Sequence, residues 1–598
     1  MKPQRVLMAR YDKVPGMNPS RLGLPEAPSN STLAGNVSST QNIIEHDQLG
    51  AEFYTTRVEG WRKVVLLLKN LKKPMVIVLA PILFSVLLQY HRKDYDCAYV
   101  VAVMAAYWVL EVMPLPITAL MPLFMFPLLG VIPAKAVAKE YLNDTNFLFI
   151  GGLIMAVAVE KCHLHERMAL SVLTLVGSKP QWIMLGFMVA TATLSMFISN
   201  TATTAMMVPI GVSVIEQLLH SKSQRSMSDT SKTDLLTMER KPNKGETLMA
   251  KGLIISICFA ANIGGTGTIT GTPPNLVVIG MLSTLFQDAD TGVHYLSWAA
   301  FAAPLMILCL LACWLVLVVL FMRDAPPADP GVTALMKKKY DDLPKMSFAE
   351  KAVGASFLVL LVLWIGRDPH VIPGFGSFFP KGYFTDATSA MAIAVLLFLI
   401  PAEIPTLKEL TSLPPEGKKK KDDRLMDWKT MNAKFPWSVV LLLGGGFALA
   451  AGVKESGLSH GIGLLLSQLA GLPTFVLQLI CLGVTMLVTN ICSNTVAASI
   501  FLPIVADLAQ QTGINPLCLM LPTTLASSYA FLLPVGTPPN AIAFASGYLK
   551  IPDMIIAGLC TSIACTIIVV GYMSSFALLV FPLNEFPAWA ALNQTMTS

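Results

Sequence analysis

Two short runs of neutral polar residues interrupt apolar segments of the sequence and are the first candidates for chemistry. Ser-Asn-Thr occurs at Ser199–Thr201 and again at Ser493–Thr495, 294 residues further on. Each copy is followed by a second break, Gly-Thr-Pro-Pro-Asn, at Gly271–Asn275 and Gly536–Asn540. Hydroxyls, amide oxygens and freed backbone carbonyls are ligands that suit an alkali cation, and helix N-termini attract anions. The paired breaks therefore indicate a site for a cation together with an anion.

The register between the two copies extends beyond the motifs. Five of the twelve residue pairs from Ser199 onward are identical, where chance would give about one. Upstream, Ser195 falls on Thr489, so that a hydroxyl stands four residues before each motif. Two halves of the chain thus share one plan of interrupted helices. This pattern points to a transporter whose binding site lies at the interface of two repeats.

The composition is that of a polytopic membrane protein. The 598 residues are 54% hydrophobic and 13% charged, and the mean hydropathy is +0.61. The net charge of +6 comes from Lys and Arg in connecting loops, where they set membrane topology, so we predict no nucleic-acid partner. The ten cysteines lie almost entirely in apolar runs without metal spacing. We therefore predict no resident metal site and no organic cofactor.

The elements that must position the motifs follow from apolar runs long enough to cross about 30 Å of hydrocarbon. The expected fold class is an all-α polytopic membrane protein with eleven transmembrane helices and two re-entrant helical hairpins in two inverted repeats. We expect the hairpins at 181–218 and 473–512, because each apolar run is long enough for two short helices. The expected spans are 64–90, 98–113, 115–133, 145–162, 250–286, 296–322, 349–366, 386–402, 436–453, 519–549 and 554–582, of which 250–286 and 519–549 are interrupted.

The domain organisation follows from the same pattern. Residues 1–60 are rich in Ser, Asn, Gly and Pro and are predicted to be a disordered cytoplasmic tail. The transporter domain is predicted over 61–583, with repeats at about 98–322 and 349–582 and cytoplasmic loops at 219–249, 323–348 and 403–435. The polybasic run Lys418–Lys421 supports the cytoplasmic side for the last loop. The C-terminal tail, 584–598, is then extracellular, and we expect its sequon at Asn593 to be glycosylated.

The residue types of the breaks suggest how they work. Ser, Asn and Thr are N-cap formers, and the Pro-Pro pairs suit a first helical turn, where no amide hydrogen is needed. Each break is therefore predicted to begin a new half-helix. If the repeats are inverted, four half-helix N-termini, each carrying about half a positive charge, converge on an anion. The motifs contain neither Lys nor Arg to neutralise it and no carboxylate for a proton relay, so we expect co-transport with Na⁺.

Charged residues also gather near the end of the predicted span 145–162. Glu160, Lys161, His163 and His165 lie there. We interpret them as an interfacial anchor with a solvated face rather than as a proton relay.

Two stretches carry a specific resemblance. Ser199–Ile210 and Ser527–Asn540 resemble the signatures of the divalent anion/sodium symporter family, in its branch of animal sodium-dependent dicarboxylate and citrate cotransporters, and the likeness extends over about 61–590. The resemblance implies a homodimer and an elevator movement of the hairpin-bearing domains. It implies one sodium site formed by Ser195, Ser199, Asn200 and Gly271, and a second formed by Thr489, Cys492, Asn494 and Gly536. It implies substrate contacts from Asn200, Thr201, Asn494, Thr495, Thr537 and Pro538.

Several functions compete with this interpretation. An enzyme would need a nucleophile, a metal cluster or an acid/base pair near the breaks, and the motifs offer only neutral polar groups. An anion channel also uses helix-end sites, and saturable sodium-dependent uptake would distinguish the two. The leading hypothesis is sodium-coupled symport of succinate, citrate and related acids across the plasma membrane. A sodium-independent carboxylate exchanger is the alternative, and sodium/sulfate cotransport is the third.

Overall fold

The structure, a computed structural model, describes residues 61–227, 243–286, 289–328, 330–367, 373–380, 382–404, 424–458 and 471–591. The predicted tail 1–60, Lys418–Lys421 and the Asn593 sequon lie outside these ranges. The chain divides into two units, Met1–Leu71 and Lys72–Ser598. Within the described ranges the regular secondary structure is helical, apart from a single bridge between Pro401 and Arg424.

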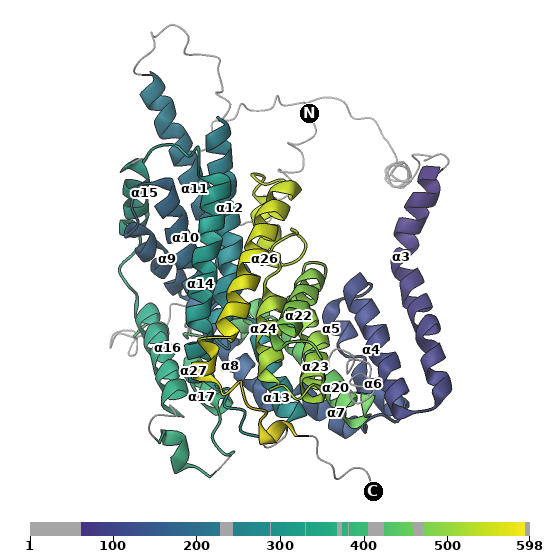
Figure 1. Cartoon of the computed structure of the whole chain (residues 1–598). Coiled ribbons are helices and arrows are strands. Elements are labelled where there is room, and N and C mark those ends of the chain that lie inside the picture. Colours follow the sequence, from purple (N-terminus) through teal and green to yellow (C-terminus); the bar gives the residue numbers. More distant parts are fainter. Residues whose placement is uncertain are drawn as a thin grey trace, which may run out of the picture. The chain divides into compact units, whose positions relative to one another are not determined.

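The first half of the chain runs through helices that carry the first pair of breaks (Figure 1). They are α3 (Trp61–Phe84), η3 (Ser85–Tyr90), α4 (Lys93–Leu110), α5 (Leu115–Thr118), α6 (Pro122–Leu128), α7 (Ala134–Tyr141), α8 (Asp144–Lys161), α9 (Leu164–Thr174), α10 (Pro180–Ser195), α11 (Asn200–Met227), α12 (Lys244–Gly264), η4 (Gly265–Gly267), α13 (Pro273–Leu285) and α14 (Tyr295–Phe321).

The second half repeats this order around the second pair of breaks. It comprises α15 (Pro330–Asp341), α16 (Phe348–Arg367), η5 (Phe375–Phe378), α17 (Asp386–Leu399), α19 (Trp428–Lys434), α20 (Trp437–Glu455), α22 (Thr474–Thr489), α23 (Asn494–Gln511), α24 (Leu517–Ser528), α25 (Pro538–Ala545), α26 (Ile551–Met573), α27 (Ala577–Val580) and η7 (Ala588–Ala590).

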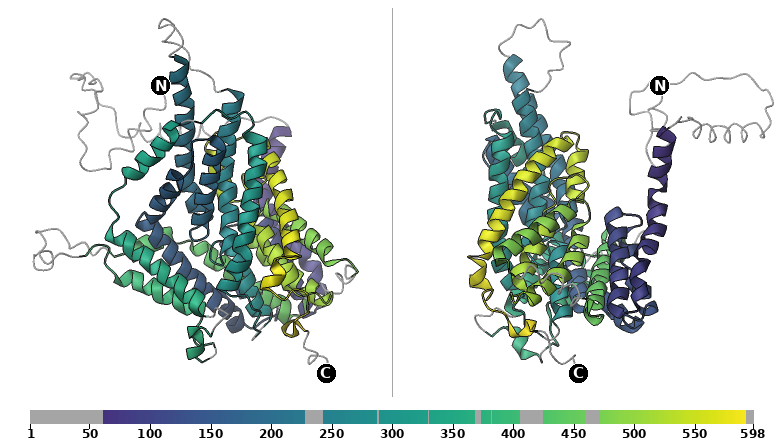
Figure 2. Two further views of the ribbon diagram at one scale, coloured as in Figure 1. Left: turned by 60° about the vertical axis from the view of Figure 1, so that its left-hand side comes forward. Right: turned by 45° about the vertical axis from the view of Figure 1, so that its right-hand side comes forward.

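Eight helical stretches of the described chain are long and apolar enough to cross a bilayer. α14 and α26 are the most apolar of them, and both can be followed as long helices in Figure 2. The described chain also contains shorter apolar helices. They include α22, which is the counterpart of α10, and the helices α13 and α24, which flank the breaks. The protein is therefore a multi-pass, all-helical membrane protein.

The predicted span 115–133 is not one continuous helix. It consists of α5 and α6, separated by Ala119–Met121, which the structure assigns to turns. Proline is the reason, because Pro122 opens α6 and each proline removes a helical amide donor. The phenolic hydroxyl of Tyr141 donates to the carbonyl of Ala119 and so satisfies part of this interrupted backbone.

The two halves pack internally in the same way and also pack against each other. α12 contacts both arms of the first hairpin, α10 and α11, as α24 contacts both arms of the second, α22 and α23. Across the halves, α25 packs on α11 and α12, and α13 packs on α23. Each helix that follows a Gly-Thr-Pro-Pro-Asn break thus lies beside the hairpin of the other half.

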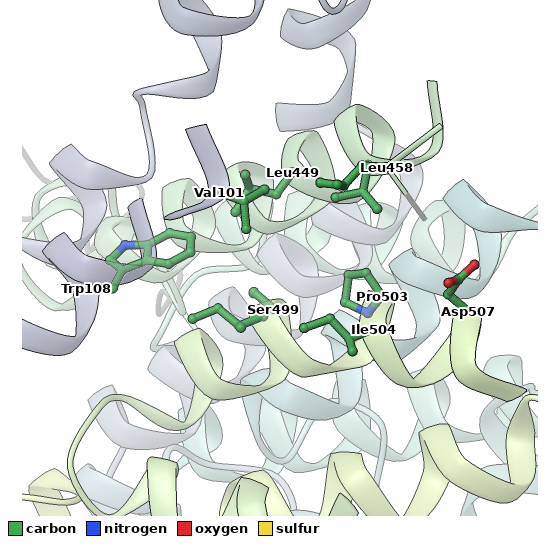
Figure 3. Close-up of a pocket in the computed structure, with 10 residues that line it drawn as sticks. Val101, Trp108, Leu449, Leu458, Ser499, Pro503, Ile504 and Asp507 are labelled. Atoms are coloured by element: carbon green, nitrogen blue, oxygen red, sulfur yellow. The ribbon is translucent and has the colours of Figure 1, made fainter. Parts of the chain in front are cut away.

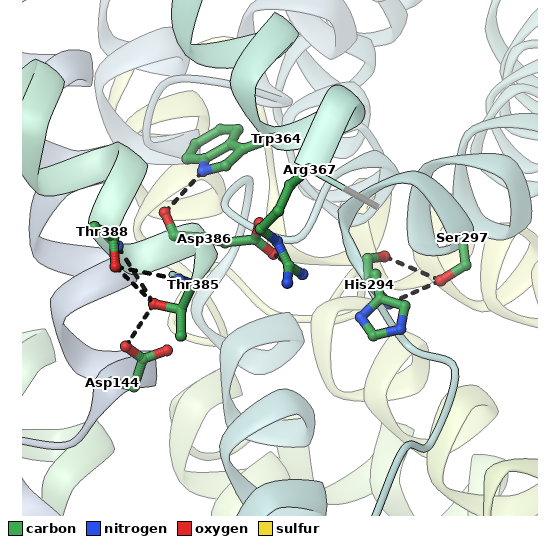
Figure 4. A network of polar contacts seen from close by, with 8 residues as sticks. All are labelled: Asp144, His294, Ser297, Trp364, Arg367, Thr385, Asp386 and Thr388. Carbon is green, nitrogen blue, oxygen red and sulfur yellow. Dashed lines mark hydrogen bonds and ion pairs between the residues drawn. The ribbon is translucent and has the colours of Figure 1, made fainter. Parts of the chain in front are cut away.

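A polar network fixes the neighbouring ends of α8, α16 and α17 (Figure 4). The Arg367 guanidinium donates through Nε and Nη2 to the two carboxylate oxygens of Asp386, at 2.6 and 3.2 Å, and Trp364 Nε1 donates to the Asp386 carbonyl at 3.0 Å. Thr385, the N-cap of α17, donates from its hydroxyl to Asp144 Oδ1 at 2.8 Å, in the first turn of α8. These contacts hold three helix ends together through charge-assisted hydrogen bonds.

The end of α8 keeps an exposed side chain at His163, which is 76% exposed, but two of its charged residues are also paired. Glu160 accepts from Lys434 Nζ at 2.6 Å, and Lys161 Nζ lies 2.8 Å from Asp427 Oδ2 and donates to the Arg424 carbonyl at 2.6 Å. The partners lie in or next to α19, which comes more than 260 residues later in the sequence. The sequence could not pair them, because only the fold brings α19 to the end of α8.

Asp427→Asn should lower the thermal unfolding midpoint at pH 7, and the difference from wild type should shrink on acidification. Burial opposes ionisation of Asp427, but hydrogen bonds from Lys161 and Thr430 outweigh it and lower the pKa of this carboxyl below its usual value. Such a group stabilises the folded state above its unfolded pKa, about 4, and this contribution is lost as pH falls towards the folded pKa. The pair is partly exposed, so the effect should be below about 1 kcal/mol. A difference independent of pH between 7 and 3, measured in detergent, would contradict this account.

Candidate functional site

All four breaks are followed directly by a helix start, as the sequence predicts. α11 begins at Asn200, α23 at Asn494, α13 at Pro273 and α25 at Pro538. The two threonines before the proline pairs have nearly the same extended conformation, with φ and ψ of −148° and 145° at Thr272 and −144° and 151° at Thr537. The N-termini of these helices leave amide groups without helical partners and so favour negative charge.

The first cluster of oxygens surrounds the end of α10. Ser195, its last residue, is fully buried, and its hydroxyl lies 2.6 Å from Asn200 Oδ1 and 2.8 Å from the carbonyl oxygen of Ala261. Ser199 is exposed, and its hydroxyl accepts from the Ala202 amide at 3.2 Å. The backbone of Gly265 also lies against the Asn200 side chain, since an added Cβ there would stand 2.6 Å from Asn200 Oδ1.

The second cluster has the same geometry. Thr489, the last residue of α22, places its buried hydroxyl 2.9 Å from Asn494 Oδ1 and 2.5 Å from the carbonyl oxygen of Ser527. Cys492, three residues after Thr489 in the sequence, is almost completely buried, at 2% exposure. The contact between Ser195 and Asn200 thus corresponds to the contact between Thr489 and Asn494. The repeat seen in the sequence therefore also holds for these side-chain contacts.

Each cluster holds more oxygen acceptors than protons. A serine or threonine hydroxyl has one hydrogen to donate, yet each of these hydroxyls lies within hydrogen-bonding distance of two acceptor oxygens. One hydroxyl proton thus serves two acceptor oxygens in each cluster. A small cation held between these neutral oxygens would relieve the repulsion between their lone pairs, and hydroxyl, amide and carbonyl oxygens are suitable ligands for it.

The unwound backbone after each cluster is held by an asparagine. Asn275 Nδ2 donates to the carbonyls of Gly265 and Thr268 at 3.1 and 2.7 Å. Its counterpart Asn540 donates to the carbonyls at 530 and 533 at 2.7 and 3.0 Å. Both asparagines are fully buried. The sequence showed them as the last residue of each Gly-Thr-Pro-Pro-Asn motif, but their role becomes apparent only from these contacts.

The two glycines of the predicted sodium sites differ in how closely they are packed. A Cβ on Gly271 would collide with the Gly265 carbonyl and would lie 2.9 Å from the Met196 carbonyl oxygen, whereas a Cβ on Gly536 would come no closer than 3.2 Å to any atom. Thr268 also donates its hydroxyl to the Met196 carbonyl. The first break is thus the tighter of the two.

The residues expected to meet a substrate are placed unequally. Thr201 and Pro538 are exposed, whereas Thr495 and Thr537 are buried at 5% and 4% exposure. Asn200 and Asn494 are half-buried at the starts of their helices. In this conformation the two asparagines are thus partly exposed, whereas only one of the two motif threonines, Thr201, is exposed.

Sequence reasoning missed one polar residue that links the halves. Asn262, in the last turn of α12, is fully buried, and its Nδ2 lies 3.3 Å from both Thr537 Oγ1 and Asn540 Oδ1. The signal was a single asparagine inside the apolar run that leads into the first break. That signal does not identify the partner, because the contact spans more than 270 residues.

A cavity of about 50 Å³ lies away from these clusters (Figure 3). It is bounded by α4, α20 and the later turns of α23, and apolar side chains such as Trp108, Leu449 and Ile504 dominate its walls. It does not include the helix starts, so we do not assign it to the candidate site. No group of three or more His, Cys, Asp or Glu residues arranged to hold a metal ion occurs in the part of the chain that the structure describes.

Comparison with known proteins finds a family model and several relatives that match most of the chain. The family described as "Sodium:sulfate symporter transmembrane region" matches residues 62–583. "Sodium-dependent high-affinity dicarboxylate transporter 3" of Caenorhabditis elegans is 54% identical, over 96% of this chain and 98% of that protein. "Na(+)/citrate cotransporter" of Rattus norvegicus is 39% identical, over 88% of this chain and 98% of that protein. Among solved structures, Neisseria gonorrhoeae MtrF aligns with a TM-score of 0.46 at 13% identity, over 74% of this chain and 83% of its own.

Gly271→Ala should destabilise the protein more than Gly536→Ala. The added methyl group at Gly271 meets backbone oxygens that cannot move without disturbing the break, whereas the one at Gly536 needs a shift of only a few tenths of an ångström. Overpacking of this kind costs about 1–3 kcal/mol. Thermal unfolding of the two purified variants in the same detergent provides the comparison. Equal midpoints would show that the two breaks are packed alike.

Proposed function

The chain belongs to the sodium:sulfate symporter family, a family of transporters and not of enzymes, and on that premise we propose that it couples sodium to the symport of di- and tricarboxylates such as succinate and citrate. The observation that carries this proposal is the pair of equivalent oxygen clusters, each with two acceptors around one hydroxyl proton. Relatives that cover most of the chain are named as sodium-dependent dicarboxylate and citrate transporters, which supports both the ion and the substrate class.

In this proposal each cluster takes one sodium ion as cargo. The first site uses Ser195, Ser199, Asn200 and the unwound backbone near Gly271, and the second uses Thr489, Asn494, the backbone at Cys492 and that near Gly536. The buried Ser195 hydroxyl and the close approach of Gly265 to Asn200 support the first set. Neutral oxygens would bind a weakly hydrated monovalent ion without the strong charge that would trap it.

The carboxylates of the substrate would meet the starts of the helices. We assign their contacts to Asn200, Thr201, Asn494, Thr495, Thr537 and Pro538. Bound sodium would supply the positive charge that the motifs lack, because helix N-termini alone would poorly offset a dianion taken out of water. Since Thr495 and Thr537 are buried, their contact with substrate would need a local rearrangement or would pass through their backbone amides.

The larger architecture is part of the same proposal. We propose eleven spans and two re-entrant hairpins in inverted repeats, a homodimer joined through the helices that do not carry breaks, and elevator movement of those that do. The N-terminus would be cytoplasmic and the C-terminus extracellular at the plasma membrane, with Asn593 available for glycosylation.

Uptake of labelled succinate and citrate tests the function directly. Cells that express the chain should accumulate both acids in sodium medium, with inward current, and should lose uptake when choline replaces sodium. Inward current with a dianion requires more than two sodium ions per substrate. Uptake that is independent of sodium and stimulated by internal carboxylate would establish an exchanger instead, and sulfate uptake alone would place the chain with sulfate cotransporters.

Asn200→Ala and Asn494→Ala should each reduce sodium-dependent uptake to background, because each removes an acceptor from its cluster and an amide from the start of its helix. Surface labelling should show the variants at the membrane in near-normal amounts. Gln181→Ala is a suitable control, since the structure gives a contact only for its backbone carbonyl, which accepts from Trp314. Normal uptake by either asparagine variant would overturn the site assignment.

Thr201→Lys should also abolish transport. The exposed side chain lies in the first turn of α11, and a lysine there would add bulk and a positive charge beside the proposed sodium ion. Thr201→Ser, which keeps the hydroxyl, is the matched control and should retain uptake. Citrate transport by the lysine variant would contradict the placement of substrate at this helix start.

A further inference from the structure

Asn262 and the preceding residue, Ala261, together link the two halves of the candidate site. The carbonyl oxygen of Ala261 lies 2.8 Å from the Ser195 hydroxyl of the first cluster. The next residue, Asn262, directs its amide nitrogen to Thr537 Oγ1 and Asn540 Oδ1 in the other half, at 3.3 Å each. Two consecutive residues of α12 therefore contact the first cluster and the second break.

The second break is sensitive to this contact because of what Asn540 does there. Asn540 uses its own amide nitrogen to hold the carbonyls of Ala530 and Leu533, and these belong to the unwound stretch that contains Gly536. Its Oδ1 faces Asn262. The orientation of Asn540, and with it the position of the unwound backbone, thus depends on the donor that Asn262 provides.

The internal pseudo-symmetry shows that this bridge is a special feature. The Ser527 carbonyl takes the place of the Ala261 carbonyl in the second cluster, so the residue equivalent to Asn262 is Ser528, whose buried hydroxyl has no described hydrogen-bond partner. Asn275, the equivalent of Asn540, has no described hydrogen-bond partner for its Oδ1. A structural requirement of the fold alone would apply to both repeats, so we regard the one-sided bridge as functional.

We infer that Asn262 is a positioning residue that couples sodium binding at the first cluster to the geometry of the second, an inference that rests on the proposed symport function. Sodium at the first cluster would draw in the Ala261 carbonyl. Because this carbonyl belongs to the turn that carries Asn262, the shift would reach Thr537 and Asn540 through the amide. The result is cooperative sodium binding, in which the first ion prepares the second site.

The test is a sodium titration of uptake by Asn262→Ser, which installs the residue found at the equivalent position of the other repeat. The variant should lose cooperativity, with a Hill coefficient for sodium close to one. Its half-saturating sodium concentration should rise at least about fivefold, as for a typical coupling between sites. The substrate KM at saturating sodium should stay within about twofold. A purely structural role would instead lower the amount of active transporter and leave the sodium dependence unchanged.

The matched control is Ser256→Ala. Ser256 lies in the same helix, is equally buried, and donates only to the Leu253 carbonyl within that helix. It should keep the wild-type Hill coefficient. Asn262→Asp, which keeps the shape but replaces the donor by an acceptor, provides the same test if the serine variant is not recovered at the surface. Thermal unfolding of each purified variant in sodium and in choline reports whether it is folded.

The outcomes separate the two proposals. Wild-type uptake without sodium dependence would overturn the proposed function itself. Cooperative sodium dependence in wild type that persists in a folded Asn262→Ser or Asn262→Asp protein would overturn only the role of Asn262.

Discussion

A backbone that leaves its helix inside a membrane must find other partners for its amide and carbonyl groups, because lipid offers none. In this protein two buried asparagines, Asn275 and Asn540, meet that requirement by donating to two carbonyls each. The proline pairs that precede them need no amide partner in the first helical turn. With the backbone stabilised in this way, the remaining carbonyls and hydroxyls can face a cation.

The same constraint explains why the two repeats correspond at the level of atoms. In each, a hydroxyl at the end of one hairpin arm lies between an asparagine five residues later and a carbonyl of the helix that leads into the next break. The repeats differ where their surroundings differ. Met196 in the first repeat corresponds to Asn490 in the second, whose side chain accepts from the Leu532 amide at 2.8 Å. In the first repeat the Thr268 hydroxyl donates to the Met196 carbonyl. The equivalent residue of the second repeat is Leu533, which has no hydroxyl, so that bond has no counterpart there.

Charge is distributed in keeping with this design. The oxygens assigned to the two clusters are neutral, while ion pairs fix helix ends, as between Arg367 and Asp386, or Lys161 and Asp427. A formal charge among those oxygens would compete with a cation or an anion for the same ligands. Charged residues placed at helix ends instead hold neighbouring helices in position.

The sequence by itself determined the class of protein, the position of the breaks and most of the helix order. It did so because apolar length, proline pairs and N-cap residues act locally, and the repeated Ser-Asn-Thr register marks Ser195 and Thr489 without any structure. Only the tertiary structure decided which carbonyls face those hydroxyls, that Thr201 is exposed while Thr495 is buried, and that Asn262 reaches Thr537. These facts depend on contacts between segments hundreds of residues apart. No local propensity encodes them, because they arise from how the two halves pack.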